Sequence, residues 1–345
     1  MTTPSQAPTS SQAPTSAQKP TPSRNPVPAQ DPVLDVRNLR VEYGGDGRGV
    51  IGADNVSFTI RAGEVFGLAG ESGCGKSTVA NALMRLLKPP ARITAGTVTF
   101  KGRDVLAMDP RELRAFRWRE IAMVFQSAMN SLNPVLTIGE QIGDIFTTHE
   151  RMRKRQARER SGELLELVGI DPARLKSYPH QLSGGMRQRV VIAMAVALKP
   201  ALLIMDEPTT ALDVVVQQEI MAQIGDLQRE LGFSVLFITH DMSLMVELSH
   251  RMGVMYGGRL VELAPAKELF ADPLHPYTQA LMDAFPPLTG PRVHLTGLAD
   301  LPRTGASCGF HAHCPDDRSD CSMNIPDLRE VAAGRFVART GGGTR

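Results

Sequence analysis

The sequence predicts an α/β fold with a buried parallel sheet, and three observations support this prediction. Two apolar runs, residues 202–206 and 235–239, are continuous rather than alternating, which is typical of parallel strands covered on both faces. A third apolar run, residues 64–70, leads into a glycine-rich turn. Residues 79–87 then carry apolar side chains at helical spacing. Strand, turn and helix in this order form one βα unit, and the other two runs predict its neighbours in the sheet.

The glycine-rich turn fits the pattern G-x-x-x-x-G-K-[ST] in full. It consists of Gly70, Glu71, Ser72, Gly73, Cys74, Gly75, Lys76, Ser77 and Thr78. Glycines let backbone N–H groups converge on phosphate oxygens, and the helix N-terminus adds partial positive charge. Lys76 can reach the β- and γ-phosphates, and the Ser77 hydroxyl can hold Mg²⁺. A chance glycine-rich turn is disfavoured because the flanking strand and helix are both present.

Composition favours a globular ATP-binding core with appendages over several domains. The chain has 345 residues, of which 42% are hydrophobic and 21% charged, with a formal net charge of +2. Near-neutral charge and few aromatic residues give no case for a nucleic-acid partner. No run approaches the roughly 20 apolar residues that span a bilayer. The N-terminus lacks the apolar segment of a secretory signal, so we expect a cytoplasmic protein.

The N-terminal tail, residues 1–31, is rich in Pro, Ser, Thr, Gln and Ala. Such a segment buries too little apolar surface to offset the entropy of ordering, so we expect disorder rather than a docking motif. Alternating segments follow at residues 34–43 and 56–60, and residues 96–100 form another predicted strand. Asp109 and Pro110 begin a short helix.

The next apolar run, residues 121–125, ends at Gln126, whose amide oxygen can reach Mg²⁺ or a water; a lone glutamine here is more often a plain loop residue. From residue 137 to 168 the pattern is helical, and its basic stretch, residues 151–160, is interpreted as a solvated face. Ser183 is a predicted N-cap, and Gly184 and Gly185 leave the following helix N-terminus open to an anion.

Two carboxylates, Asp206 and Glu207, end the predicted strand at residues 202–206. Unpaired buried charge is costly, and Mg²⁺ on Asp206 would supply a partner. Glu207 can polarise a water against the γ-phosphate. Asp213 follows in a turn before the next helix. His240 ends the next strand; a lone histidine is usually structural, but at this position it is a candidate γ-phosphate donor.

The C-terminal third begins with a predicted hairpin, residues 252–262, that turns at Gly257 and Gly258. Short helices are predicted at residues 266–270 and from residue 275 to 286. Beyond them stand three cysteines, Cys308, Cys314 and Cys321. In a reducing compartment such a cluster indicates a metal site or thiols before disulfides.

Taken in order, these motifs resemble the ATPase subunit of an ABC transporter. The Leu-Ser-Gly-Gly element, residues 182–185, separates this family from other phosphate-loop ATPases. Residues 130–142 and 275–281 are similar to the subfamily that takes up di- and oligopeptides or nickel. The resemblance implies a P-loop NTPase core with an antiparallel β subdomain and a helical insert. It divides the chain into the tail 1–31, an ABC ATPase domain 32–285 with its helical subdomain at about 127–195, and a cysteine-containing extension 286–345.

The resemblance also implies a role for each site residue. Tyr43 would stack on adenine, and residues 70–78 would wrap the phosphates, with Lys76 among the catalytic groups. Gln126 would sense Mg²⁺ and face the membrane subunit. Asp206 would serve Mg²⁺, Glu207 the attacking water and His240 the γ-phosphate. The opposite half-site would consist of Ser183, Gly184 and Gly185, reaching the γ-phosphate held by a second ATPase subunit, with Asp213 at the dimer seam.

The implied partners are a second ATPase subunit, identical or different, two transmembrane permease subunits and, indirectly, an external substrate-binding protein. The chain would then be peripheral on the cytoplasmic face of the cell membrane, coupling ATP hydrolysis to uptake of di- or oligopeptides. Nickel or another small solute is the alternative cargo. A soluble ABC ATPase acting on nucleic acid or ribosomes is disfavoured by the single cassette and near-neutral charge, and a regulator without turnover is opposed by Glu207 and His240.

In this subfamily the cysteine tail resembles a [4Fe–4S] site. Four thiolates are the common ligand set. Here Phe336-Val-Ala-Arg339 occupies the place of the fourth cysteine. Three outcomes stay open: a cluster with three cysteines and another ligand, a zinc site completed by His311 or His313, or no metal. Cys74 is not assigned as a ligand.

Overall fold

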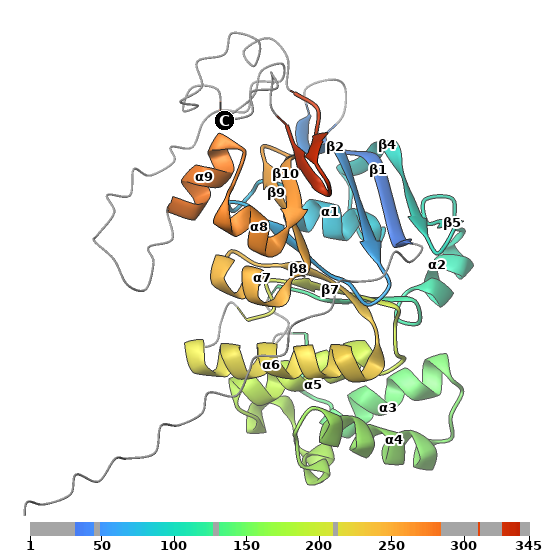
Figure 1. Ribbon diagram of the computed structural model, residues 1–345. Helices are drawn as coiled ribbons and strands as arrows, with labels where there is room; N and C mark the ends of the chain where they lie inside the picture. The colour runs from blue at the N-terminus through green and yellow to red at the C-terminus, as the bar shows by residue number, and fades with distance from the viewer. Residues whose placement is uncertain are drawn as a thin grey trace, which may run out of the picture.

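The computed structural model describes residues 32–44, 49–126, 131–209, 213–283, 310 and 326–338. Within these ranges the chain forms a four-stranded and an eight-stranded sheet, with helices packed around them (Figure 1). The predicted disordered tail, residues 1–31, lies outside the described residues. No helix in the described ranges is long and apolar enough to cross a membrane.

The smaller sheet is antiparallel and has the strand order β2-β1-β4-β5. Its strands are β1 (Pro32–Tyr43), β2 (Val50–Arg61), β4 (Ala91–Phe100) and β5 (Arg103–Asp104). The alternation predicted for residues 34–43 and 56–60 is confirmed, because every second side chain near the strand centres is buried. The second strand begins earlier than expected, since residues 50–55 also pair with β1.

The larger sheet contains the three continuous apolar runs. Its strand order is β11-β12-β10-β9-β3-β8-β7-β6. Five parallel strands form one side of it: β3 (Val65–Ala69), β6 (Ile121–Val124), β7 (Leu202–Asp206), β8 (Ser234–Ile238) and β9 (Arg251–Tyr256). Every residue of β3, β7 and β8 is buried, which confirms the prediction of a doubly covered parallel sheet.

Successive residues of these strands point into two different hydrophobic cores. In β3, Phe66 and Leu68 join the core shared with α1 (Lys76–Leu83) and the antiparallel sheet. Val65 and Ala69 join the core on the opposite face, which contains the helical insert. The sheet therefore separates a layer that carries the phosphate-loop helix from a layer that carries the insert.

The remaining helices were mostly expected from the sequence. They are α2 (Pro110–Phe116), α3 (Ile138–His149), α4 (Lys154–Leu167), α5 (Gly184–Val196), α6 (Val214–Leu231), α7 (Met242–Leu248), α8 (Ala266–Ala271) and α9 (Pro276–Asp283). Figure 1 places α3 to α6 below the larger sheet, with α1 above it beside the antiparallel strands. Helices α8 and α9 lie beside β9 and β10 (Arg259–Pro265).

Two helix boundaries differ from the prediction. The helical pattern of residues 137–168 is two helices, because Arg151 has a φ of +55° between the end of α3 and the start of α4. The helix after the phosphate loop begins at Lys76 and ends at Leu83, before the predicted residue 87. Arg85, with a φ of +50°, stops it there.

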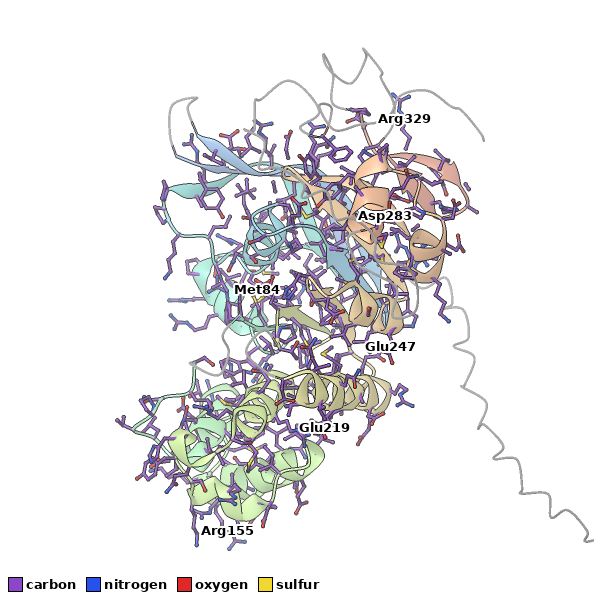
Figure 2. All side chains as sticks on the ribbon, turned by 90° about the vertical axis from the view of Figure 1, so that its left-hand side faces the viewer. Met84, Arg155, Glu219, Glu247, Asp283 and Arg329 are labelled. Atoms are coloured by element: carbon purple, nitrogen blue, oxygen red, sulfur yellow. The ribbon has the colours of Figure 1, made fainter. Side chains whose placement is uncertain are left out.

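The C-terminal extension adds strands that the sequence pattern did not indicate. β11 (Arg329–Ala332) and β12 (Arg335–Val337) form a hairpin, and β12 pairs with β10 through Glu262 and Val337. Figure 2 shows Arg329 near one end of the molecule and Arg155 of α4 at the other. Part of the extension is thus a continuation of the larger sheet.

Candidate nucleotide site

The phosphate loop lies between β3 and α1, and its glycines pack closely against backbone atoms of neighbouring segments. A Cβ on Gly70, which has a φ of +142°, would lie 2.3 Å from the carbonyl oxygen of Met255. A Cβ on Gly75, with a φ of +108°, would lie 2.1 Å from the carbonyl oxygen of Gly52. Both glycines are therefore required by close approach as well as by backbone conformation.

Lys76 is buried, and its ammonium group is held inside the loop. Nζ donates to the carbonyl oxygens of Gly70 and Glu71, at 2.6 and 2.7 Å. Cys74 is also buried, with its Sγ 3.6 Å from Nζ. A buried cation over a glycine-rich loop at a helix N-terminus has the geometry and charge of a phosphate cradle.

Asp206 and Ser77 meet at the carboxyl end of β7. Ser77 Oγ donates to Asp206 Oδ1 at 3.1 Å, and Asp206 is buried. Burial raises the pKa of Asp206, and the neighbouring Glu207 charge raises it further, while the Ser77 hydrogen bond and the Lys76 charge act in the opposite direction. A hydroxyl and a carboxylate side by side suit Mg²⁺, which takes few protein ligands and fills its shell with water and phosphate oxygens. No group of three or more His, Cys, Asp or Glu side chains suited to a metal occurs in the described part of the chain.

Glu207 is the centre of a second set of contacts. The residues in this set follow the ends of three adjacent strands, β6, β7 and β8. Its carboxylate accepts from Gln126 Nε2 at 2.8 Å and lies 3.7 Å from Nδ1 of His240. Its own backbone has a φ of +47°, which is rare outside glycine, and its N–H donates to the carbonyl of Ile238 at 2.8 Å. We call Gln126, Asp206, Glu207 and His240 the strand-end cluster.

Tyr43 stands at the end of β1, beside the start of α1. Its hydroxyl lies 2.9 Å from Oγ1 of Thr78, the last residue of the phosphate loop, and the side chain is 37% exposed. An exposed ring tethered to this loop presents a face on which a flat base can stack.

The predicted opposite half-site lies elsewhere. Ser183 Oγ accepts from the backbone N–H of Met186 at 3.2 Å, so Ser183 is the N-cap of α5, as predicted. Asp213 Oδ1 accepts from Val216 at 3.0 Å and caps α6 in the same way. A Cβ on Gly185 would lie 2.8 Å from Val216 Cγ1, so the two helix starts are in contact. We call Ser183, Gly184, Gly185 and Asp213 the seam group.

The seam group and the phosphate loop are not brought together within one chain. α5 packs in the core below the larger sheet, whereas α1 packs in the core above it. Among the described residues, the side-chain hydrogen bonds of Ser183 and Asp213 stay within their own helix starts. The three predicted cysteine ligands lie outside the described residues, so the structure does not place them.

One residue beside the phosphate loop was given no role from the sequence. Tyr277 is fully buried, and its hydroxyl accepts from the backbone N–H of Glu71 at 3.1 Å. From the sequence, its segment, residues 275–281, indicates only the resemblance to the peptide-uptake subfamily. The available signal was a tyrosine following Pro276 at the start of an apolar helix, which indicates core packing but not which loop it reaches.

Two family models match the chain. The model described as ABC transporter matches residues 53–210, which contain the phosphate loop and the strand-end residues up to Glu207. The model described as oligopeptide/dipeptide transporter, C-terminal region, matches residues 261–321.

Curated proteins that are similar to the chain share most of its length. A probable peptide ABC transporter ATP-binding protein of Sinorhizobium fredii is 44% identical over 89% of this chain and 94% of its own length. The dipeptide transport ATP-binding protein DppD of Bacillus subtilis is 42% identical over 85% of this chain and 90% of its own length. The oligopeptide transport ATP-binding protein OppD of Salmonella typhimurium is 41% identical over 89% of this chain and 92% of its own length.

Solved structures agree with the fold. A dimeric ATP-binding cassette in a post-hydrolysis state, bound to ADP and phosphate, matches with a TM-score of 0.60 and 30% identity. That match covers 68% of this chain and 98% of the cassette.

Proposed function

The chain belongs to the ABC transporter family as an ATP-hydrolysing subunit of a peptide importer, and from this premise we propose how its residues divide the work. The observation that carries the proposal is the strand-end cluster. A strained glutamate, fixed by a glutamine and facing a histidine, lies beside a buried lysine and an aspartate bonded to the phosphate-loop serine. Phosphoryl transfer requires such positioned charges.

Nucleotide binding is assigned to Tyr43 and the phosphate loop. The tyrosine ring stacks on adenine, and the backbone N–H groups of residues 70–78 surround the phosphates. Lys76 exchanges its bonds to the carbonyls of Gly70 and Glu71 for phosphate oxygens. Ser77 and Asp206 would hold Mg²⁺, which would offset the negative charge of the nucleotide phosphates.

Hydrolysis is assigned to the strand-end cluster. Glu207 orients and polarises the attacking water as general base. Gln126 fixes the carboxylate of Glu207, and His240, exposed next to it, donates to the γ-phosphate. The backbone strain at Glu207 is consistent with a functional position, since such conformations persist where the surrounding structure enforces them.

The site is composite, with the seam group of one subunit completing the phosphate loop of another. Ser183, Gly184 and Gly185 present the N-terminus of α5 away from their own phosphate loop, which supports a contact in trans. The ATPase partner is a second cassette. The helical insert carries motion to the permease subunits, and exposed apolar side chains at Phe125, which precedes Gln126 in the chain, and at Val135 and Leu136 support docking there.

We propose peptides as the cargo, received by the permeases from an external binding protein. The relatives' names and the matched C-terminal region support this choice over nickel or another small solute. Association with the cytoplasmic face of the membrane follows from the same partners. Growth of a strain lacking this chain on peptides as the only amino-acid source, with and without the restored chain, tests the cargo; growth on peptides unaffected by its loss would contradict it.

The Glu207→Gln substitution tests the catalytic assignment. The amide keeps the contact with Gln126 but cannot accept a proton, so phosphate release should fall by about 10²–10⁴-fold. ATP binding and ATP-dependent association should persist, as measured by nucleotide titration and light scattering. Glu120→Gln, at an exposed ion pair with Lys101, is the matched control and should keep full turnover. Equal turnover in Glu207→Gln and wild type would refute the role of Glu207.

We further propose that Cys308, Cys314 and Cys321 bind a [4Fe–4S] cluster. They lie outside the described residues, and the support is the resemblance of this cysteine tail to the [4Fe–4S] site of the subfamily; since the tail has three thiolates, another group would supply the fourth ligand. Iron and acid-labile sulfide assayed on anaerobically purified full-length protein, compared with the triple Cys→Ser variant, test it. Equal iron in both proteins, or zinc in place of iron, would overturn it.

A further inference from the structure

Glu71, the second residue of the phosphate loop, is held from both sides. Its carbonyl accepts from Lys76 Nζ at 2.7 Å, on the inner side of the loop. Its N–H donates to the hydroxyl of Tyr277 at 3.1 Å. Tyr277 belongs to α9 and lies 206 residues after Glu71 in the chain. The loop is thus fixed by an element that is distant in the sequence.

Tyr277 is in turn held by an aromatic cluster. Its ring centroid lies 4.4 Å from that of Tyr256 and 5.6 Å from that of Phe310, the latter at an interplanar angle of 72°. Phe310 also meets Tyr256 edge-on at 5.7 Å, and it is only 2% exposed. Aromatic pairs at these distances and angles are favourable beyond the area that they bury. Phe310 belongs to the C-terminal extension, so the extension packs directly against the tyrosine that contacts the phosphate loop.

The backbone around Tyr277 is fixed by a buried carboxylate. Glu262 of β10 accepts from the backbone N–H groups of Leu274 and His275, each at 2.9 Å. Nδ1 of His275 then accepts from the backbone N–H of Tyr277 at 3.1 Å. Because the start of α9 is held this firmly, the Tyr277 hydroxyl has a defined position relative to the loop.

We propose that Tyr277 is a positioning residue for the phosphate loop, and that the C-terminal extension holds Tyr277 in place through Phe310. The inference rests on the proposed role of this loop in binding ATP. Without the Tyr277 hydroxyl, the N–H of Glu71 loses its partner and the loop samples more conformations. Nucleotide affinity then falls, because part of the binding free energy is spent on ordering the loop.

The decisive variant is Tyr277→Phe, which removes one oxygen and keeps the ring. We expect the Kd for ATP, measured by calorimetry on the full chain, to rise about three- to tenfold, as for loss of one hydrogen bond. KM should rise by a similar factor, with kcat at saturating ATP nearly unchanged. Amide hydrogen exchange in residues 70–76 should quicken. An unchanged Kd and unchanged exchange in this variant would overturn the positioning role.

The link to the extension is tested by Phe310→Leu and by the double variant. If Phe310 acts through Tyr277, Phe310→Leu raises the Kd, and the double variant binds no more weakly than Tyr277→Phe alone. Additive effects, or no effect of Phe310→Leu on the Kd, would overturn the link. The matched control is Phe116→Leu, a buried ring in edge contact with Phe100 beneath the antiparallel sheet. It should lower the melting temperature without changing the Kd.

The outcomes separate this inference from the proposed function. A wild-type chain that binds no ATP would refute the proposed function itself. A wild-type chain that binds ATP, with variants that bind it equally well, would refute only the positioning role.

Discussion

The strand-end cluster and the seam group are both predicted to act on the nucleotide, yet their surroundings differ. Glu207 in the cluster is contacted by Gln126 and His240, which come from neighbouring strands. In the seam group, the side-chain hydrogen bonds of Ser183 and Asp213 to other described residues stay within the first turns of their own helices. One region is assembled by long-range contacts of the sheet, and the other is prepared locally by helix capping.

In the proposed composite site, this difference separates the half that folds within one chain from the half that acts on a second chain. A parallel sheet brings the carboxyl ends of its strands together, so the cluster forms whenever the sheet folds. A helix N-terminus with two glycines needs an anion that its own chain does not deliver. In the proposed composite site the seam group is therefore completed by a second subunit, and changes there that keep the helix caps should affect activity without affecting the fold.

Among the variants that compare the two regions, the largest effect is expected for Ser183→Asp. Aspartate caps a helix as well as serine does, so the melting temperature should hold, but its charge would repel the γ-phosphate. We expect ATP hydrolysis to fall at least about 100-fold, as when a preorganised donor to a transition state is lost. Ser183→Asn, a neutral cap, is the control and should retain far more activity. Equal activity of the two variants would place Ser183 outside the site.

A smaller effect is expected on the other side of the comparison, for Gln126→Ala. Loss of the 2.8 Å bond to Glu207 frees the carboxylate to rotate, and turnover should fall about tenfold, the lower end of the range for a hydrogen bond to a charged group. Gln228 donates to the carbonyl of Gly63 at the same 2.8 Å, far from the cluster. Gln228→Ala should lower the melting temperature and leave turnover intact. If Gln126→Ala lowered only the melting temperature and Gln228→Ala lowered turnover, the cluster would be structural.

The smallest effect concerns stability alone, at Glu262. Burial raises its pKa above the ordinary 4.5, against the opposing bonds from Leu274 and His275 and the Arg335 charge. The folded state therefore binds this proton more tightly than the unfolded state does, and stability falls as pH rises from about 4.5 through the folded pKa, by about 1.4 kcal/mol per unit of pKa shift. Glu262→Gln removes this decline. Melting curves of the two proteins that stay parallel from pH 4.5 to 8 would contradict it.

The local features of the site were predictable from sequence because their signals are local. The phosphate loop, the cap at Ser183 and the turn at Gly257 and Gly258 all depend on residue types within a few positions, and the structure places each as expected. The grouping of Gln126 with Glu207 required only that parallel strands end on one side of a sheet.

The features that were missed depend on contacts between distant segments. The side chains of β11 are all exposed, so its residues show no alternation of buried and solvated positions. β12 has three residues, too few to reveal a period. The bond from Glu71 to Tyr277 joins residues that no sequence spacing relates. The break between α3 and α4 depends on the backbone of Arg151, an arginine in a basic run that is otherwise compatible with a helix.

The pairing of β12 with β10 has a practical consequence for anyone who shortens this protein. A chain cut after α9 would leave the backbone N–H and C=O groups of β10 without the two pairs at Glu262 and Leu263. An open sheet margin of this kind invites pairing with other molecules. Trimming the last sixty residues to obtain a minimal cassette should therefore give a chain prone to association and precipitation, whereas removing residues 1–31 removes no strand pair formed by the described residues.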